Sequence, residues 1–254
     1  LAGLATAAET TVLTPVAGTE NHNCDPSIIR GANGKFYLHY SITPTGYETK
    51  ARVAEATSPD GPWTKLTGLV LDSSPITQIL AQCGPYDTAP CHQYGRGQTS
   101  VARGPDGYYY LAHTDQNVPN TNPNVTPPAS IKILKSANAN FLSGVSTVKT
   151  FTAAEIGGAG AELSWDSGTS RFLLAVPGGT GGTRLNITDT SFNIVGRIEL
   201  DRGTRTHSEG QALLRNEYGD VVWPLGQMVI ASASPRAIVK LIPRKIDSGP
   251  SAAG

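Results

Sequence analysis

Three acidic residues stand at the starts of apolar, strand-like segments that lie far apart in the sequence: Asp25, Glu162 and Glu209. Carboxyl groups that converge on one polar cleft can hydrolyse a glycosidic bond. One group is kept protonated and donates to the leaving oxygen, while another stays ionised and activates water or attacks the sugar. A third carboxylate nearby raises its neighbour's pKa by like-charge repulsion. These residues therefore predict acid–base chemistry on a carbohydrate, provided that the fold brings them together.

Polar residues close to these carboxylates are candidates for binding the substrate: His22, Tyr94, Arg96, Gln98 and His207. The guanidinium of Arg96 suits a sugar hydroxyl or a substrate carboxylate. His22 lies three residues before Asp25, and His207 lies two before Glu209. Either histidine could bind a sugar hydroxyl or a central ion, or serve as a hydrogen-bonded structural residue.

The elements that must position these residues are repeated hairpins. Segments 25–40 and 98–113 each join an apolar strand, a Gly-containing turn and an aromatic strand, and Asp25 is as far from Tyr37 as Gln98 is from Tyr110. Looser copies of this hairpin are found at 161–175 and 208–223. Further strands are predicted at 51–57, 63–65, 130–135, 183–188, 194–198 and 237–242.

Units of up to four strands that recur along a chain are typical of the blades of an all-β propeller. We count four blades, and the remaining segments leave little room for a complete fifth. A β-sandwich is the alternative, but a sandwich does not require the same hairpin four times. No segment has the period of a substantial helix. Hairpin packing is the expected role of Tyr37, Tyr109 and Tyr110. Core packing between blades is the expected role of Trp63, Trp165 and Trp223.

In a propeller the first strand of every blade runs along the central axis. Residues at the starts of these strands therefore meet at one end of the channel. The repeat accordingly predicts that Asp25, Gln98, Glu162 and Glu209 surround a common centre.

Two of the repeats resemble a known family. The run Asn23-Cys24-Asp25-Pro26-Ser27-Ile28-Ile29, followed by Gly34-Lys35-Phe36-Tyr37-Leu38, resembles the first blade of glycoside hydrolase family 43 and its five-bladed propeller relatives. Residues 52–64 are similar to the outer part of that blade, and Ser208-Glu209-Gly210-Gln211 resembles the family's Glu-Gly-Pro blade start. The resemblance extends over residues 25–242 and implies a five-bladed propeller.

The resemblance also implies roles for the carboxylates. Asp25 matches the general base, Glu209 matches the general acid, and Glu162 lies near the place of a third carboxylate that tunes the acid. The implied substrate is a plant- or microbial-type polysaccharide or oligosaccharide of the arabinan or xylan kind. A central structural Ca²⁺ is compatible with the family, although no ligand motif is visible in the sequence, and no other metal or cofactor is expected.

Other features favour different functions. Gln98 occupies a blade start, and Ala161-Glu162-Leu163 stands where the family has Asp-Pro. Both differences favour a carbohydrate-binding propeller without catalysis. Long insertions at 71–97 and 115–129 are expected to shape a binding face, and they would also suit a protein-interaction scaffold.

Composition limits the partners. The 254 residues carry 20 Lys and Arg against 20 Asp and Glu, so the formal net charge gives no electrostatic case for nucleic acid or an anionic membrane. No apolar run reaches the roughly 18 residues of a transmembrane helix. We expect a monomer with one propeller domain at 21–247, an N-terminal segment at 1–20 and a disordered tail at 248–254.

The N-terminal residues and the cysteines favour export to the extracellular space or the periplasm. Residues 1–9 are similar to the remains of a secretory signal, and segment 1–20 is expected to be such a remnant or a closing strand. Cys83 and Cys91 bracket a turn-rich segment that a disulfide could close, and a bridge from Cys24 to one of them is the alternative.

Overall fold

The protein is nearly all β-structure in a computed structural model. The residues that the structure describes are 11–20, 23–43, 49–72, 79–80, 91–92, 95–116, 129–177, 183–200, 209–222, 227–232 and 237–243. At 79–80, 91–92, 200, 209–212, 227–232 and 237–243 the description covers the backbone alone. The N-terminal residues 1–10 and the predicted tail 248–254 lie outside it.

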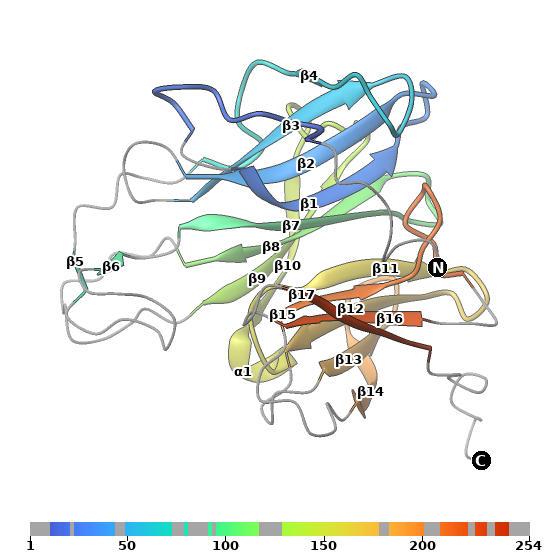
Figure 1. Ribbon diagram of the computed structural model, residues 1–254. Coiled ribbons are helices and arrows are strands. Elements are labelled where there is room, and N and C mark those ends of the chain that lie inside the picture. Colours follow the sequence, from blue (N-terminus) through green and yellow to red (C-terminus); the bar gives the residue numbers. More distant parts are fainter. Residues whose placement is uncertain are drawn as a thin grey trace, which may run out of the picture.

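The strands form antiparallel sheets that follow one another along the chain (Figure 1). The first blade contains β1 (Asn23–Arg30), β2 (Phe36–Ile42), β3 (Lys50–Ala56) and β4 (Thr64–Lys65). The second contains β7 (Arg96–Arg103), β8 (Tyr109–Asp115), β9 (Ser130–Ser136) and β10 (Ser146–Thr152). The third contains β11 (Glu162–Asp166), β12 (Arg171–Pro177), β13 (Thr183–Thr188) and β14 (Ile194–Leu200), and the fourth β15 (Glu209–Leu213), β16 (Gln227–Ser232) and β17 (Ala237–Pro243).

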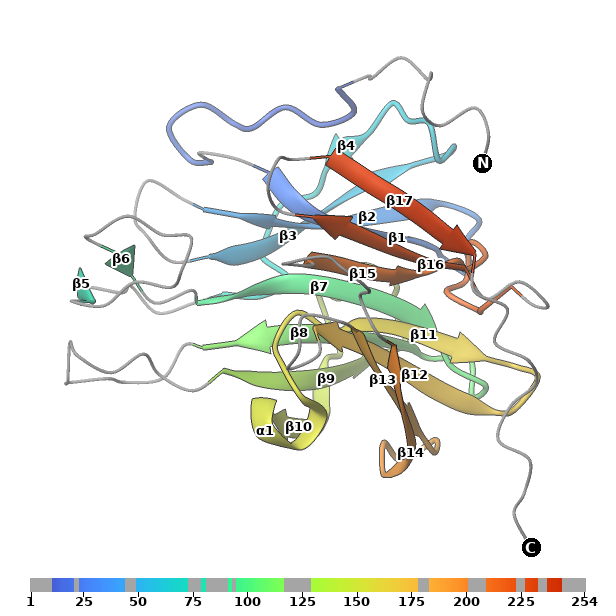
Figure 2. The ribbon, with the colours of Figure 1, turned by 60° about the horizontal axis from the view of Figure 1, so that its bottom comes forward.

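The first strands of the blades, β1, β7, β11 and β15, are the inner strands of a β-propeller, as Figure 2 shows from a second direction. This arrangement confirms the predicted fold class. The short pair β5 (Ile79–Leu80) and β6 (Cys91–His92) lies apart from the blades in both views. The one helix among the described residues is the single turn α1 (Ala153–Ile156), which agrees with the absence of helical periodicity.

The repeated hairpin is confirmed in the first two blades, where Ile29 pairs with Tyr37 and Ala102 pairs with Tyr110. The fourth blade differs from the prediction, because β15 pairs with β16 rather than with residues 219–223. Segment 219–222 forms a short hairpin with 214–216, in which Arg215 bridges Val221 and Val222 N donates to Leu214 O at 3.1 Å. The N–H of Val221 bonds across to the third blade, where it donates to Trp165 O at 2.7 Å.

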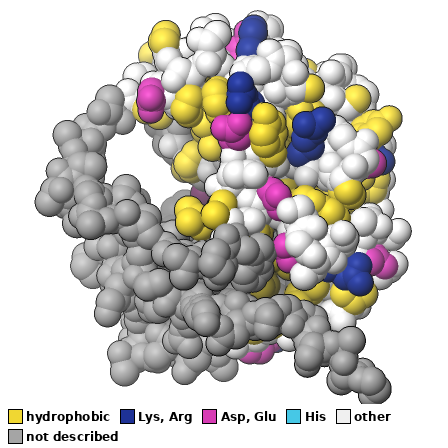
Figure 3. All heavy atoms as spheres, turned by 90° about the vertical axis from the view of Figure 1, so that its right-hand side faces the viewer, with side chains coloured by type: hydrophobic (Ala, Val, Ile, Leu, Met, Phe, Trp, Pro, Cys, Tyr) yellow, Lys and Arg dark blue, Asp and Glu magenta, His cyan; other side chains and the backbone are white. Residues whose placement is uncertain are grey.

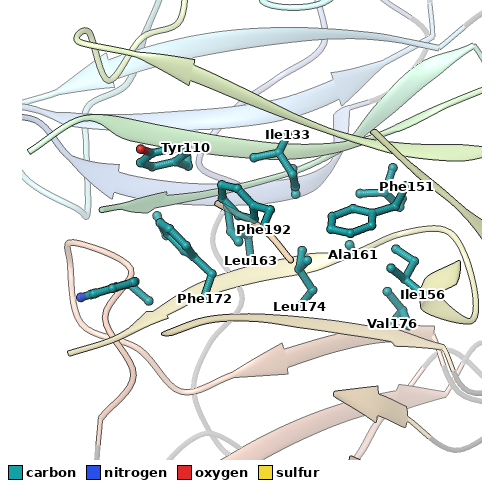
Figure 4. Close-up of a cluster of buried hydrophobic side chains, with 14 residues drawn as sticks. Tyr110, Ile133, Phe151, Ile156, Ala161, Leu163, Phe172, Leu174, Val176 and Phe192 are labelled. Carbon is teal, nitrogen blue, oxygen red and sulfur yellow. The ribbon is translucent and has the colours of Figure 1, made fainter. Parts of the chain in front are cut away.

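Apolar side chains between neighbouring blades form the core. Figure 4 shows the cluster between the second and third blades, which includes Tyr110, Ile133, Phe151, Leu163, Phe172, Leu174 and Phe192. A second cluster joins the first and second blades, and a third joins the third and fourth. Tyr37, Tyr109, Tyr110 and Trp165 are buried, which confirms their predicted packing role. Trp63 packs on the first blade, and Trp223 lies outside the described residues.

Residues 11–20 cover the other face of the first blade. They form no strand, but Leu13 packs against the cluster of Tyr40, Ile42 and Ala54. The side chain of Glu20 is fully buried there and pairs with Arg52 and Lys65. Apolar contact and buried charge pairing together hold this segment against β3 and β4.

One core histidine predicts acid sensitivity. His39 is fully buried, its Nε2 bonds to Ala139 O at 2.8 Å, and burial lowers its pKa to about 4. The unfolded chain therefore binds a proton at higher pH than the folded chain does. Stability from this group is present above pH 6.5 and is lost as the pH falls toward 4, by up to about 3 kcal/mol.

Replacing His39 by Gln keeps an N–H donor for Ala139 O and removes the titration. We expect urea unfolding at pH 7 and at pH 4.5 to differ less for His39→Gln than for the unmodified protein. His113 has a similarly lowered pKa and adds to the pH dependence of both proteins. The quantity compared is therefore the change in unfolding free energy between pH 7 and pH 4.5, taken for each protein. An identical pH dependence in both would contradict this assignment.

Candidate active site

The inner strands share an irregularity near their starts. The pairing register shifts between Cys24 and Ser27 on β1 and between Gly97 and Ser100 on β7. Within these bulges Asp25 has φ 50° and Gln98 has φ 52°, in the left-handed region that residues with side chains seldom adopt. Such strained residues cluster at functional sites. A matching register shift lies between Glu209 and Ala212 on β15.

Hydrogen bonds between blades fix which positions are equivalent. Val101 N donates to Ser27 Oγ at 3.1 Å, and Leu163 N donates in the same way to Ser100 Oγ at 2.9 Å. Counting back from these bonds aligns Gly160 with Asp25 and Gln98, and Gly160 also has a positive φ of 76°. The bulge on β15 aligns Gly210 with the same position.

Two rings of residues follow from this register. We call Asp25, Gln98, Gly160 and Gly210 the entry ring, and Ser27, Ser100, Glu162 and Ala212 the deep ring. The prediction that Glu162 and Glu209 share a level with Asp25 and Gln98 is therefore corrected. Glu162 lies two residues further along its inner strand, and the backbone of Glu209 lies one residue before the ring position, level with Cys24 and Gly97. Gly160 could have revealed the position of Glu162, because glycine is the residue type that best tolerates the left-handed backbone of the ring position.

The deep ring is held by a single side chain from the fourth blade. Arg215 Nη1 donates to Leu163 O at 2.7 Å and to Val101 O at 3.0 Å, and Nη2 donates to Ser27 Oγ at 2.9 Å. Nη1 also lies 3.0 Å from Glu162 Oε1. This guanidinium, which is not among the residues predicted from the sequence, links the fourth blade to the other three.

The turn that follows Arg215 closes the far end of the axis. Three consecutive carbonyls, of Glu217, Tyr218 and Gly219, accept hydrogen bonds from the backbone N–H groups of Arg30, Arg103 and Trp165 at 2.7–2.9 Å. Each of these N–H groups belongs to the inner strand of a different blade. Figure 3 views this end, where Lys and Arg side chains are interspersed with Asp and Glu in the described part of the surface.

Glu162 is a largely buried carboxyl group beside the largely buried guanidinium of Arg215. Its side chain is 17% exposed and that of Arg215 is 13% exposed. Burial raises the pKa of Glu162, while the charge of Arg215 and a hydrogen bond from Ser100 act in the opposite direction. A carboxyl group in such surroundings is a functional candidate as well as a structural partner.

Asp25 has a thiol as its neighbour. Cys24 Sγ donates to Asp25 Oδ2 at 3.4 Å, and burial, followed by the charge of Asp25, raises the pKa of Cys24 to about 12. Cys24 is a free thiol, so the alternative disulfide from Cys24 is wrong. The expected bridge between Cys83 and Cys91 involves side chains outside the described part of the chain.

The predicted substrate-binding residues differ in their surroundings. Arg96 lies on the second blade, where Nε bonds to Asp115 Oδ2 at 3.1 Å and Nη1 bonds to Asp72 O at 2.7 Å. Gln98 lies in the entry ring, and its Oε1 accepts from Thr114 Oγ1 at 2.7 Å. His22, Tyr94 and His207 lie outside the described residues, and the description of Glu209 covers only its backbone.

The described ranges contain no group of three or more His, Cys, Asp and Glu side chains placed to hold a metal ion. They also contain no helix with the length and apolar character needed to cross a membrane.

Comparison with known proteins gives the fold class independently. The sequence matches no protein-family model and no curated protein. The structure is similar to a family 43 glycoside hydrolase from Bacillus licheniformis (TM-score 0.53, 16% identity) and to xylan β-1,4-xylosidase from Bacillus halodurans (0.54, 14%). These matches cover 85% and 86% of this chain, which spans 38% of each relative.

A third similar structure is closer in length. The endo-arabinase from Bacteroides thetaiotaomicron has a TM-score of 0.51 and 11% identity over 87% of this chain and 75% of its own. The chain thus has the propeller fold of family 43 glycoside hydrolases, as the sequence resemblance predicts.

The pairing of Arg215 with Glu162 predicts a large and pH-dependent contribution to stability. Arg215→Met leaves Glu162 buried without a counter-charge, which should lower the free energy of unfolding by about 3–5 kcal/mol at pH 7. The loss should shrink as the pH falls, because protonated Glu162 no longer needs the guanidinium. Urea unfolding at pH 7 and pH 4.5 measures both effects.

Glu217→Gln is the matched control, because it breaks an exposed ion pair in the adjacent turn, between Arg30 and Glu217 at 2.7 Å. Such a pair contributes about 1 kcal/mol or less. A loss in Arg215→Met that is equal at both pH values would show that packing, and not charge pairing, dominates this site.

Proposed function

We propose that this protein is a glycoside hydrolase in which Asp25 and Glu209 act as general base and general acid. The observation that carries the proposal is a β-bulge that recurs near the start of two inner strands. The bulge that turns Asp25 into the left-handed region on β1 is repeated on β15 immediately after Glu209. This recurrence on inner strands of different blades supports a site to which both acids contribute.

In the proposed reaction Glu209 gives its proton to the glycosidic oxygen as the bond to the anomeric carbon breaks. Water attacks that carbon and gives a proton to Asp25. Glu162 lies one level below Asp25, next to Arg215. There it contributes to the field that sets the acidity of the pair.

The substrate class proposed is a pentose-containing polysaccharide or oligosaccharide of the arabinan or xylan kind. The similar structures named as a xylosidase and an endo-arabinase support this choice. The partly exposed positions of Asp25 and Gln98 in the entry ring suit a ligand that binds above the inner strands.

One observation favours a second candidate, a carbohydrate-binding propeller without catalysis. Of the four entry-ring positions, only Asp25 carries an acid, since the others are Gln98, Gly160 and Gly210. A binding protein needs polar groups at this end of the axis but no paired carboxylates. Turnover separates the two candidates.

Loss of either proposed catalytic acid should abolish hydrolysis. We expect Asp25→Asn and Glu209→Gln each to lower kcat by about 10²–10⁴-fold, the usual contribution of a positioned acid or base. The assay measures release of nitrophenol from aryl arabinofuranosides and xylopyranosides, and of reducing sugar from arabinan and xylan.

Glu217→Gln serves as the control variant and should retain full activity, because Glu217 lies in the turn at the opposite end of the axis. Undiminished activity in Asp25→Asn or Glu209→Gln would refute the assigned roles. Glycan binding without any turnover by the unmodified protein would favour the binding function.

A further inference from the structure

Gln98 lies at the end of a hydrogen-bonded chain that links two blades. Gly160 N donates to Thr114 Oγ1 at 2.9 Å, and Thr114 Oγ1 donates to Gln98 Oε1 at 2.7 Å. Thr114 is 3% exposed, so its hydroxyl is enclosed between the second and third blades. The hydroxyl accepts from the backbone and donates its one proton to Gln98, which holds the carboxamide oxygen as the acceptor.

The carboxamide also occupies space that a side chain would otherwise fill. A Cβ atom built on Gly160 would lie 3.3 Å from Gln98 Oε1 and 3.5 Å from Cδ and Nε2. Gly160 is the entry-ring residue of the third blade and has φ 76°. The side chain of Gln98 therefore reaches from its own blade to the position of the next one.

Fixing the oxygen also fixes the amide nitrogen. Oε1 accepts from Thr114, and the backbone N–H of Gln98 donates to Ser41 Oγ at 2.9 Å. No described residue accepts a hydrogen bond from Nε2. The entry ring thus offers a pre-oriented N–H donor, held on a residue whose backbone is itself in the left-handed region.

We propose that Gln98 binds the ligand by donating from Nε2 to an uncharged oxygen of a sugar, and that Thr114 is the positioning residue that orients it. This inference rests on the proposed carbohydrate site and specifies one of its subsites. The ligand group is a hydroxyl, ring or glycosidic oxygen.

The test measures binding of arabinotriose and xylotriose by calorimetry. Asp25→Asn is the background, so that hydrolysis does not interfere. Gln98→Ala should raise Kd about tenfold, because one hydrogen bond is lost from a partly desolvated site. Thr114→Val should raise Kd several-fold, and Thr114→Ser, which keeps the hydroxyl, should bind like the background protein. Ser130→Ala removes a hydroxyl of the same blade outside this chain of bonds and should have no effect.

A double-mutant cycle separates positioning from a merely structural role. If Thr114 acts through Gln98, Thr114→Val should have no further effect on Kd in the Gln98→Ala background. Additive effects would overturn the role of Thr114, and unchanged binding by Gln98→Ala would overturn the subsite.

The outcomes also separate this inference from the proposed reaction. Tight binding that depends on Gln98, in a protein that hydrolyses no glycan, would refute the hydrolase and leave the subsite standing. No binding of either trisaccharide by the background protein and by the unmodified protein would overturn both.

Discussion

The buried guanidinium of Arg215 is the interaction on which the rest of this arrangement depends. Here one planar group with several donors satisfies two backbone carbonyls, a serine hydroxyl and the carboxylate of Glu162. Arginine suits this role because its charge persists at all relevant pH values and its donors have a fixed geometry.

The same region shows how blade packing and site geometry are coupled. The turn at 216–219 aligns the ends of three inner strands through backbone hydrogen bonds. Nearer the starts of the inner strands, the hydroxyl groups of Ser27 and Ser100 accept hydrogen bonds from backbone N–H groups of the next blade. With these levels fixed, the bulges that carry Asp25 and Gln98 have little freedom to move relative to each other. Pre-organisation of this kind is what acid–base chemistry on a bound sugar requires.

Backbone strain distinguishes the entry ring from the rest of the strands. Asp25 and Gln98 hold left-handed conformations that cost free energy for a residue with a Cβ atom. The third and fourth blades have Gly160 and Gly210 at this position. Within the entry ring, left-handed strain in a residue with a side chain is thus confined to Asp25 and Gln98. Gly160 in turn leaves room for the side chain of Gln98.

Sequence alone predicted the all-β class, the repeated hairpins, the packing of Tyr37, Tyr109 and Tyr110, and Asp25 and Gln98 as equivalent positions. These properties follow from local patterning, because strand alternation, turn glycines and hairpin spacing act over a few residues. Sequence did not predict the strands β10 and β16, and it placed Glu162 one level too high. The third blade has no bulge within β11, so its register depends on hydrogen bonds to the second blade. Only the tertiary structure decided that Glu162 pairs with Arg215 and that Thr114 orients Gln98. The first contact joins two blades, and the second joins neighbouring strands of one blade and depends on a bond from Gly160 of the next. Side-chain contacts of this kind leave no periodic signal in the sequence.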